Sequence, residues 1–206
     1  IAITLLSAAM PFTAKAQDKV KASVGADIVS GYICADNLGG EAFNNASIAY
    51  KGLSLVSMGI GGIERTDADG YDAKEFDLTL GYSTGGFSVS ITDYWYNTGA
   101  GYFHYGAHNT THLYEAQVGY DFGPVAVNWY TNFAGDDGVK ENGDRAYSSY
   151  ISIAAPFKLG GLDWTAEVGA TPWETDFYGA SGFTVCDVSL GATKISEYNH
   201  SPATLA

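Results

Sequence analysis

The sequence predicts an all-β protein, an antiparallel up-and-down transmembrane β-barrel. Three observations predict it: short turns alternate with long polar loops, the expected strands are long, and apolar side chains alternate with polar ones along them. Tilted membrane strands need about 9–11 residues, whereas strands in soluble proteins average about five or six. Short turns at one end and long loops at the other are typical of outer-membrane barrels.

Ten strands are expected, separated by connections of two kinds. The short connections contain glycine or proline and lie at 51–52, 84–86, 123–124 and 158–161. The long connections are polar and lie at 37–43, 65–72, 97–109, 135–145 and 174–182. The expected strands cover 20–36, 44–51, 53–64, 73–83, 87–97, 110–122, 125–134, 145–157, 162–173 and 182–194. An even number of strands agrees with bacterial outer-membrane barrels.

Alternation with a period of two supports these strands, beginning with the first. Ala26 and Ile28 share one of its faces, and Lys21 and Asp27 share the other. The same separation recurs in the strands expected at 73–83, 110–122, 125–134 and 162–173. Because successive side chains point to opposite faces, each set lies on one face of the sheet. We expect the polar set to face a wet lumen and the apolar set to face lipid, the reverse of a soluble barrel.

Composition fits this fold and argues against other classes. Charged residues make up 16% of the chain, against about 25% in soluble domains. The chain is rich in Tyr, Phe and Gly, and aromatic residues favour strands. No run of about 18 apolar residues predicts a transmembrane helix. The net charge of −13 argues against nucleic acid as a partner, since phosphate binding needs clustered Lys and Arg.

Aromatic residues gather near both ends of the expected strands. Those of the expected outer rim, beside the long loops, include Tyr94, Trp95, Tyr96 and Trp173. Two such bands match the interfacial girdles of membrane barrels. Ordinary strand aromatics at turns are the alternative, and a sugar-binding platform is a further one for 94–96.

Acidic residues dominate the expected lumen face. They are Asp27, Glu75, Asp77, Glu115, Asp121, Asp163, Glu167 and Asp187, with Lys21 the only clear cation. An unpaired carboxylate is costly in a dry interior, so these acids indicate water in the lumen. A wet acidic pore attracts cations. The alternative is a narrow barrel in which the acids bond to Tyr and Asn neighbours and nothing passes.

Three histidines, His104, His108 and His112, are spaced by four residues. A helix would align them as metal ligands, but the surrounding sequence predicts loop and strand. On a strand they would lie about 13 Å apart, too far to share one ion. We therefore expect no metal site and solvated or interfacial histidines, although loop folding could pair His104 with His108. No Gly-x-Ser-x-Gly elbow occurs, and we expect neither an enzyme nor a cofactor.

Asp93 interrupts an outward apolar series formed by Phe87, Val89 and Ile91. A charge that faces lipid is costly. Either a β-bulge shifts the register there, or Asp93 lies above the apolar band, as its aromatic neighbours indicate.

The two ends of the chain suggest export and an incomplete ring. An apolar stretch at 1–10 precedes a small-x-small pattern at 14–16, so we expect a signal-peptide remnant at 1–16. A single barrel domain is then expected over 17–206. The segment 195–202 resembles another short turn, which favours a C-terminally truncated twelve-strand barrel. A closed ten-strand barrel is the alternative.

The cysteines bear on that choice. Cys34 and Cys186 lie near the outer ends of the first and tenth strands. They could approach each other in a ten-strand ring, whereas an additional hairpin would separate them. We expect two inert, lipid-facing thiols.

Several short segments contain motifs that reflect the fold rather than a catalytic activity. They lie at 49–55, 75–83, 92–96, 131–136 and 171–174. They resemble a family of Gram-negative outer-membrane barrels from Bacteroides-like bacteria, the Gcw-type conserved hypothetical proteins, over roughly residues 20–194. The resemblance implies an exported barrel and supplies no activity or catalytic residues to carry over. The family's closing strands are absent from this sequence, which leaves barrel closure open.

These observations together predict a small porin-like channel in the outer membrane of a Gram-negative bacterium. Its partners would be the lipid bilayer and small cationic or neutral solutes. A non-conducting barrel that displays extracellular loops for binding or structure is the first alternative. A soluble secreted β protein is the second.

Overall fold

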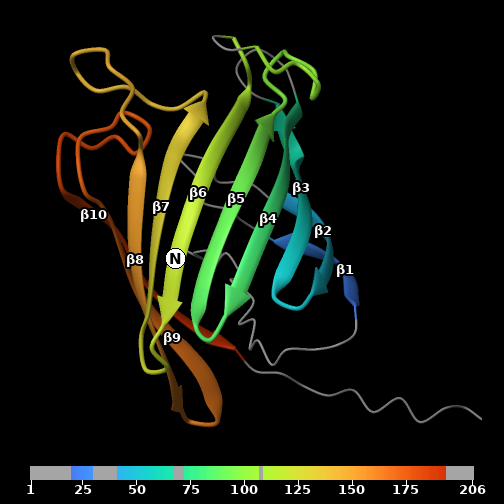
Figure 1. Cartoon of the computed structure of the whole chain (residues 1–206), viewed down its shortest axis with the longest axis vertical. Helices are drawn as coiled ribbons and strands as arrows, with labels where there is room; N and C mark the ends of the chain where they lie inside the picture. The colour runs from blue at the N-terminus through green and yellow to red at the C-terminus, as the bar shows by residue number, and fades with distance from the viewer. Residues whose placement is uncertain (1–19, 30–40, 67–71, 107–108, 194–206) are drawn as a thin grey trace, which may run out of the picture.

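The computed structural model describes residues 20–29, 41–66, 72–106 and 109–193, which are all-β (Figure 1). Ten strands form one antiparallel sheet, in which each strand pairs with its neighbours in sequence. They are β1 (Lys21–Val29), β2 (Glu41–Tyr50), β3 (Leu53–Thr66), β4 (Asp72–Thr84), β5 (Phe87–Tyr96), β6 (His112–Asp121), β7 (Ala126–Gly135), β8 (Ser149–Leu159), β9 (Leu162–Thr171) and β10 (Thr184–Thr193). The prediction of an all-β, up-and-down antiparallel sheet is therefore confirmed.

Three short connections are two-residue hairpin turns with positive φ at both positions. Their residues are Lys51 and Gly52, Gly85 and Gly86, and Gly160 and Gly161. Turns of this kind match the right-handed twist of the flanking strands and favour glycine, which has no Cβ to oppose a positive φ. Glycine thus sets the register at this end of the sheet.

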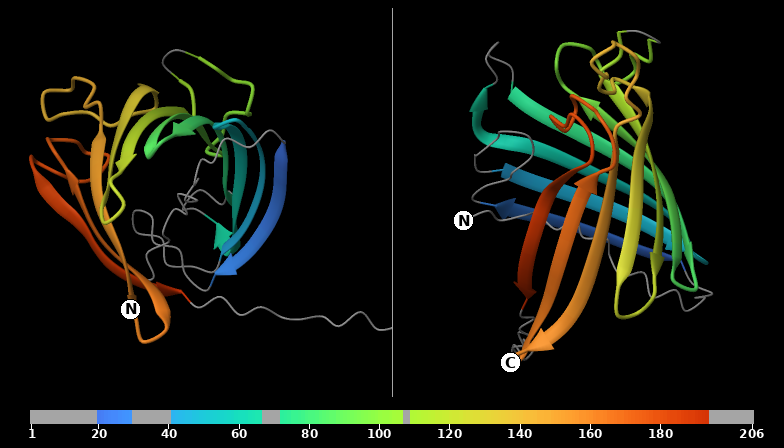
Figure 2. Two further views of the ribbon diagram at one scale, coloured as in Figure 1. Left: turned by 60° about the horizontal axis from the view of Figure 1, so that its bottom comes forward. Right: turned by 90° about the vertical axis from the view of Figure 1, so that its left-hand side faces the viewer.

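The sheet is curled, and its connections are sorted by length. The long loops gather at one end and the short turns at the other (Figure 1). Figure 2 shows the curl, with β1 and β10 as the two edge strands. Over the described residues, β1 pairs only with β2 and β10 only with β9.

The two faces differ in polarity and burial. We call the face that carries Asp77 the polar face and the opposite one the apolar face. On the apolar face, Leu80 is 53% exposed and Ile91, its neighbour on β5, is 50% exposed, whereas Asp77 on the polar face is only 3% exposed. Among the described residues, three apolar side chains are buried and nine polar ones are. This burial is the reverse of that in a soluble protein.

Within the described residues, the largest difference between an expected strand and the observed one is at the start of β8. The strand expected from 145 begins at Ser149, because the preceding residues belong to a loop. Ala146 N donates there to Gly138 O at 2.9 Å, and Tyr147 has a φ of 49°. The first strand is described as far as Val29, and its expected remainder lies outside the described residues.

The strand register decides between the two interpretations of Asp93. Pairing of β5 with both neighbours is continuous through Asp93, so the alternative of a β-bulge at this residue is wrong. One shift lies between Tyr114 and Glu115, and another lies between Val185 and Asp187. The intervening Cys186 is an exposed free thiol, and the other cysteine, at position 34, lies outside the described residues.

Within the described ranges, no helix is long and apolar enough to cross a membrane.

Candidate functional site

Near the middle of the sheet, the polar face is a connected layer of hydrogen bonds. The Gln117 amide donates to Ser88 Oγ at 3.2 Å and to Asn128 Oδ1 at 3.1 Å, while its oxygen accepts from Ser90 at 3.1 Å. All three bonds of this side chain run to strands on either side of β6. Polar side chains here satisfy one another across strands, and Gln117 is held in one orientation.

Nearer the long loops, the same face carries buried acceptor oxygens. Both carboxylate oxygens of Asp77 are buried, and so is Asn132 Oδ1. Tyr94, directly opposite Asp77 on β5, donates to Glu115 Oε1 at 3.0 Å. Glu115 in turn lies opposite Asn132 on β7.

The predicted lumen acids fall into three groups. Glu75, Asp77 and Glu115 lie near the long-loop end, and Glu75 and Glu115 both act electrostatically on Asp77. Asp121 and Asp163 lie next to the short turns, on strands that also carry Glu115 and Glu167.

The acids beside the short turns have nearby donors. Asp121 accepts from Gly123 N at 2.7 Å, and Asp163 forms a 2.7 Å ion pair with Lys158. This second cation on the polar face was missed, because Lys158 reads as part of a turn. Its pairing follows from the β8–β9 register, in which the two residues are directly opposite.

The third group lies on the last strands and the first. Glu167 and Asp187 share the polar face, because Glu167 pairs with Ser189 and Asp187 with Gly169. Asp27 pairs with Phe43 through the backbone, and its side chain is outside the described residues.

The expected aromatic rim is divided between the faces and the loops. Tyr94 and Tyr96 alternate with Trp95, so they lie on the polar face and Trp95 lies on the apolar face. The Trp95 indole donates to Ala100 O at 3.1 Å, and the Trp173 indole donates to Ala146 O at 3.0 Å. Both indoles therefore hold loop backbone in place.

The expectation of a solvated His112 is wrong, because this side chain is fully buried. His112 Nδ1 lies 2.6 Å from Asp93 Oδ1, and Nε2 lies 2.6 Å from Tyr102 O. Both ring nitrogens are thus occupied by acceptors, which leaves neither free to activate a hydroxyl group. In the sequence, the contact between His112 and Asp93 is signalled only by the break in alternation at Asp93.

Aromatic rings of the β5–β6 loop cover this pair. Tyr105 stacks on the imidazole with centroids 4.3 Å apart, and Tyr102 meets it edge-on at 5.2 Å. Burial, with a hydrogen bond to Tyr105, raises the pKa of Tyr102 to about 12, so its phenol stays neutral at physiological pH. Phe103, by contrast, is 87% exposed on the same loop.

The other two histidines remain apart from this cluster. His104 is exposed, and its carbonyl oxygen accepts from Thr110 Oγ1 at 3.1 Å. His108 lies outside the described residues. In the part of the chain that is described, no group of three or more His, Cys, Asp or Glu side chains is arranged to hold a metal ion.

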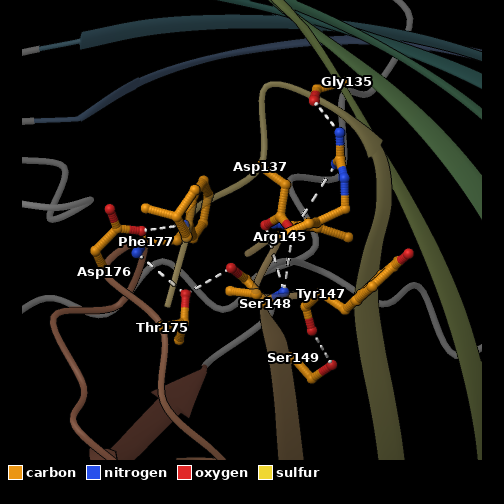
Figure 3. A network of polar contacts seen from close by, with 12 residues as sticks. Gly135, Asp137, Arg145, Tyr147, Ser148, Ser149, Thr175, Asp176 and Phe177 are labelled. Carbon is orange, nitrogen blue, oxygen red and sulfur yellow. Dashed lines mark hydrogen bonds and ion pairs between the residues drawn. The ribbon is translucent and has the colours of Figure 1, made fainter. Parts of the chain in front are cut away.

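The loop from β7 to β8 and the loop from β9 to β10 are joined by polar contacts (Figure 3). Ser148 and Thr175 share a 2.6 Å hydroxyl bond, and Asp176 Oδ1 accepts from Val139 N at 2.6 Å. The Glu141 amide also donates to Glu174. We call this pair of joined loops the loop knot.

Asp137 organises the knot from within. Its fully buried carboxylate accepts from Ser148 N and from Asn132 Nδ2, each at 3.3 Å, and lies 4.0 Å from Arg145 Nη1 (Figure 3). The Arg145 guanidinium also donates to Gly135 O at 3.0 Å. Charge on this loop aspartate is therefore countered within the knot.

In comparisons with known proteins, the sequence matches no protein-family model and no curated protein, and the fold matches no solved structure.

Proposed function

We propose that this sheet is the wall of an outer-membrane β-barrel of a Gram-negative bacterium, a small porin-like channel for cationic or neutral solutes. The observation that carries the proposal is the reversed burial of the two faces. Leu80, Ile91 and Val118 are each about half exposed on adjoining strands, while Asp77 and Asn132 are buried on the opposite face. Lipid requires an apolar outer wall, and a channel requires a polar inner one.

The apolar face supports a membrane environment on energetic grounds. Burying apolar surface is worth roughly 25 cal/mol per Å², and this face leaves large apolar side chains exposed from β1 to β10. Val24 is 86% exposed at one edge and Val188 is 75% exposed near the other. In water, a continuous face of this kind would promote aggregation. In a bilayer, the same face is solvated by lipid.

The charge of the polar face supports a preference for cations. Carboxylates recur along β4, β6, β9 and β10, whereas Lys158 is already paired with Asp163. A low-dielectric wall with charges of one sign concentrates counter-ions and repels ions of like charge.

Planar-bilayer recording tests the channel. The full chain, refolded in detergent, is expected to give discrete conductance steps whose reversal potential in a salt gradient favours cations. An anion-favouring reversal potential would contradict the proposed selectivity. Extraction of the protein from cells by buffer without detergent would contradict the membrane assignment itself.

The loop knot favours a second function, in which the barrel displays a rigid surface for binding. Ser148 and Thr175 are buried side chains in loops, and Trp173 ties its own loop to the backbone beside Tyr147. Loops ordered to this degree are typical of binding surfaces on a rigid scaffold. A folded, heat-modifiable protein that gives silent bilayers would favour this function over the channel.

A further inference from the structure

The β5–β6 loop, residues 97–111, is held against the apolar face of the sheet. Tyr102 meets Phe76 on β4, Trp95 on β5 and His112 on β6 edge-on, with ring centroids 5.5, 5.9 and 5.2 Å away. These three residues share the apolar face, because Phe76 pairs with Trp95 and Trp95 pairs with His112. One tyrosine therefore anchors the loop to the outer wall across three strands.

Two aromatic residues that follow this anchor are exposed. Phe103 is 87% exposed, and Tyr105 is 53% exposed although it stacks on the His112 ring. We call Tyr102, Phe103 and Tyr105 the aromatic flap. Because its anchor rests on the apolar face, the flap adds exposed aromatic surface to a face that is already apolar and exposed.

The charge of the loop differs from that of the other long loops described. Residues 97–111 contain no Asp, Glu, Lys or Arg, whereas the two loops of the loop knot together contain six acidic and two basic residues. Charged groups are costly next to lipid and are readily solvated by water. The loop that carries the flap therefore suits lipid, and the loop knot suits water.

Backbone oxygens close to the flap have hydrogen-bond donors within the protein. Ala100 O accepts from the Trp95 indole at 3.1 Å, Gly101 O accepts from His104 N at 2.9 Å, and His104 O accepts from Thr110 Oγ1 at 3.1 Å. A backbone group without a partner is costly in lipid, where no water replaces the missing bond. These carbonyl groups are therefore compatible with a position beside lipid.

The strand register gives the depth of the flap in the proposed membrane. Phe87 pairs with Tyr120 beside the short turns, and Trp95 lies eight residues further along β5. Eight residues at about 3.3 Å each, on a strand tilted by about 40°, correspond to about 20 Å along the membrane normal. The apolar band of an outer-membrane barrel is about 25 Å tall, with aromatic residues at both edges. Trp95 thus lies at the outer edge of this band, and the flap packs on it.

We propose that the aromatic flap is a lipid-binding surface, which inserts Phe103 and Tyr105 at the boundary between the head groups and acyl chains of the outer leaflet. The surface rests on the proposed function, because it requires the apolar face to lie in a membrane. Aromatic side chains favour this boundary, and a tyrosine there keeps its hydroxyl group among the head groups. The long loops then have two roles, since the flap contacts lipid while the loop knot faces water.

Nitroxide labels at single cysteines test the depth of the flap. The full chain, with Cys34→Ser and Cys186→Ser, is folded into phosphatidylcholine vesicles and labelled at Phe103→Cys. Collision of the label with oxygen, which enters lipid, is compared with its collision with a water-soluble nickel chelate. We expect the label to lie about 5–10 Å below the level of the head groups.

Two reference labels distinguish failure of the flap from failure of the membrane assignment. Leu80→Cys lies on the apolar face and should be deeper than Phe103→Cys, whereas Asn142→Cys is exposed in the loop knot and should collide mainly with the chelate. A label at Phe103→Cys that behaves like the one at Asn142→Cys would overturn the lipid surface, and the apolar wall would stand if Leu80→Cys stays in lipid. Protection from both reagents would also overturn it, because protein would then cover the flap. Water at Leu80→Cys would overturn the membrane wall together with the flap.

A pair of matched aromatic substitutions gives a second measurement if the labelled variant does not fold, as judged by heat-modifiable mobility on gels. Phe103→Trp adds a fifth tryptophan in the flap, and Phe177→Trp adds one in the loop knot. Brominated phosphatidylcholine is expected to quench the fluorescence added by Phe103→Trp and to leave that added by Phe177→Trp unchanged. Equal quenching of the two added signals would overturn the lipid surface.

Discussion

His112 and Asp93 are in side-chain contact on the apolar face of the sheet, with Nδ1 and Oδ1 2.6 Å apart. The two residues are diagonal neighbours, because Asp93 pairs with Tyr114 and Trp95 pairs with His112. Tyr102 O accepts at the other ring nitrogen. The β5–β6 loop thus covers a polar group that lipid would not tolerate.

Removal of this pair is expected to release the loop. Asp93→Ala leaves the buried His112 ring without its carboxylate, which should cost about 1–3 kcal/mol of unfolding free energy. Cleavage by chymotrypsin after Phe103 or Tyr105 should become faster, because Tyr102 is no longer held against the sheet. Urea unfolding in micelles and the rate of cleavage measure the two effects. His104→Ala is the control, because His104 is exposed in the same loop. Equal rates of cleavage in the two variants would contradict the role of Asp93 in holding the loop against the sheet.

A second substitution is expected to stabilise the protein. Asp77→Asn replaces a buried acid, which interacts with Glu75, Asp93 and Glu115, with a neutral amide of the same shape. Relief of the burial cost and of this repulsion should raise the free energy of unfolding by about 1–2 kcal/mol. Denaturant titration in micelles measures it. The exposed Asp163 should behave oppositely, since Asp163→Asn loses a surface ion pair worth about 0–1 kcal/mol. A loss of stability in the Asp77 variant would show that its carboxylate is satisfied.

The strand order, turn positions and polarity of the faces could all be predicted from sequence, because each has a local cause. Period-two alternation assigns faces, and glycine pairs such as Gly85 and Gly86 mark the tight turns. The acids of the polar face could be placed for the same reason.

Contacts that depend on register and on loop folding could not be predicted. His112 meets Asp93 only because β5 and β6 pair in one register, and Tyr102 closes the pair from a loop. Arg145 and its neighbours continue an alternating pattern, yet loop contacts take them out of β8. Local sequence carries no signal for either arrangement.

Gly135 and Gly143 have nearly equal positive φ angles but different surroundings. Substitutions at the two positions therefore distinguish the cost of backbone strain from that of a steric clash. Gly135 has a φ of +82° and Gly143 a φ of +84°, but a Cβ on Gly135 would lie 2.1 Å from His112 O while one on Gly143 meets nothing within 4 Å. Alanine at either position pays the cost of a positive φ. Gly135→Ala must also displace backbone, so it should be less stable than Gly143→Ala by at least about 1 kcal/mol. Denaturant titration of the pair measures the difference, and equal losses would contradict the close approach of β7 to His112.

The loop knot is expected to depend on one buried hydroxyl. Thr175 Oγ1 shares a 2.6 Å bond with Ser148 Oγ and accepts from Phe177 N at 3.1 Å. Thr175→Val keeps the shape and removes both bonds, at a cost of about 1–3 kcal/mol. Hydrogen exchange should become faster at the Val139 and Ser148 amides and stay unchanged at β4 and β5. Thr98→Val is the control, because Thr98 is exposed in the β5–β6 loop. Unaltered hydrogen exchange in the loop knot of the Thr175 variant would contradict a cooperative structure of the knot.

A charge on the apolar face distinguishes a membrane wall from a soluble sheet. Leu80 lies within β4 opposite Leu55 and Ile91 and is half exposed. In water, Leu80→Arg at an exposed site should change stability by no more than about 0.5 kcal/mol. In a bilayer, arginine near the midplane costs about 2–4 kcal/mol, falling to about 0–1 near the interface. Thr84→Arg, on the same strand beside the short turn, is therefore the matched control. Unfolding titrations in lipid vesicles should give a loss for Leu80→Arg that exceeds the loss for Thr84→Arg by about 2 kcal/mol, and equal losses would place the apolar face outside the membrane.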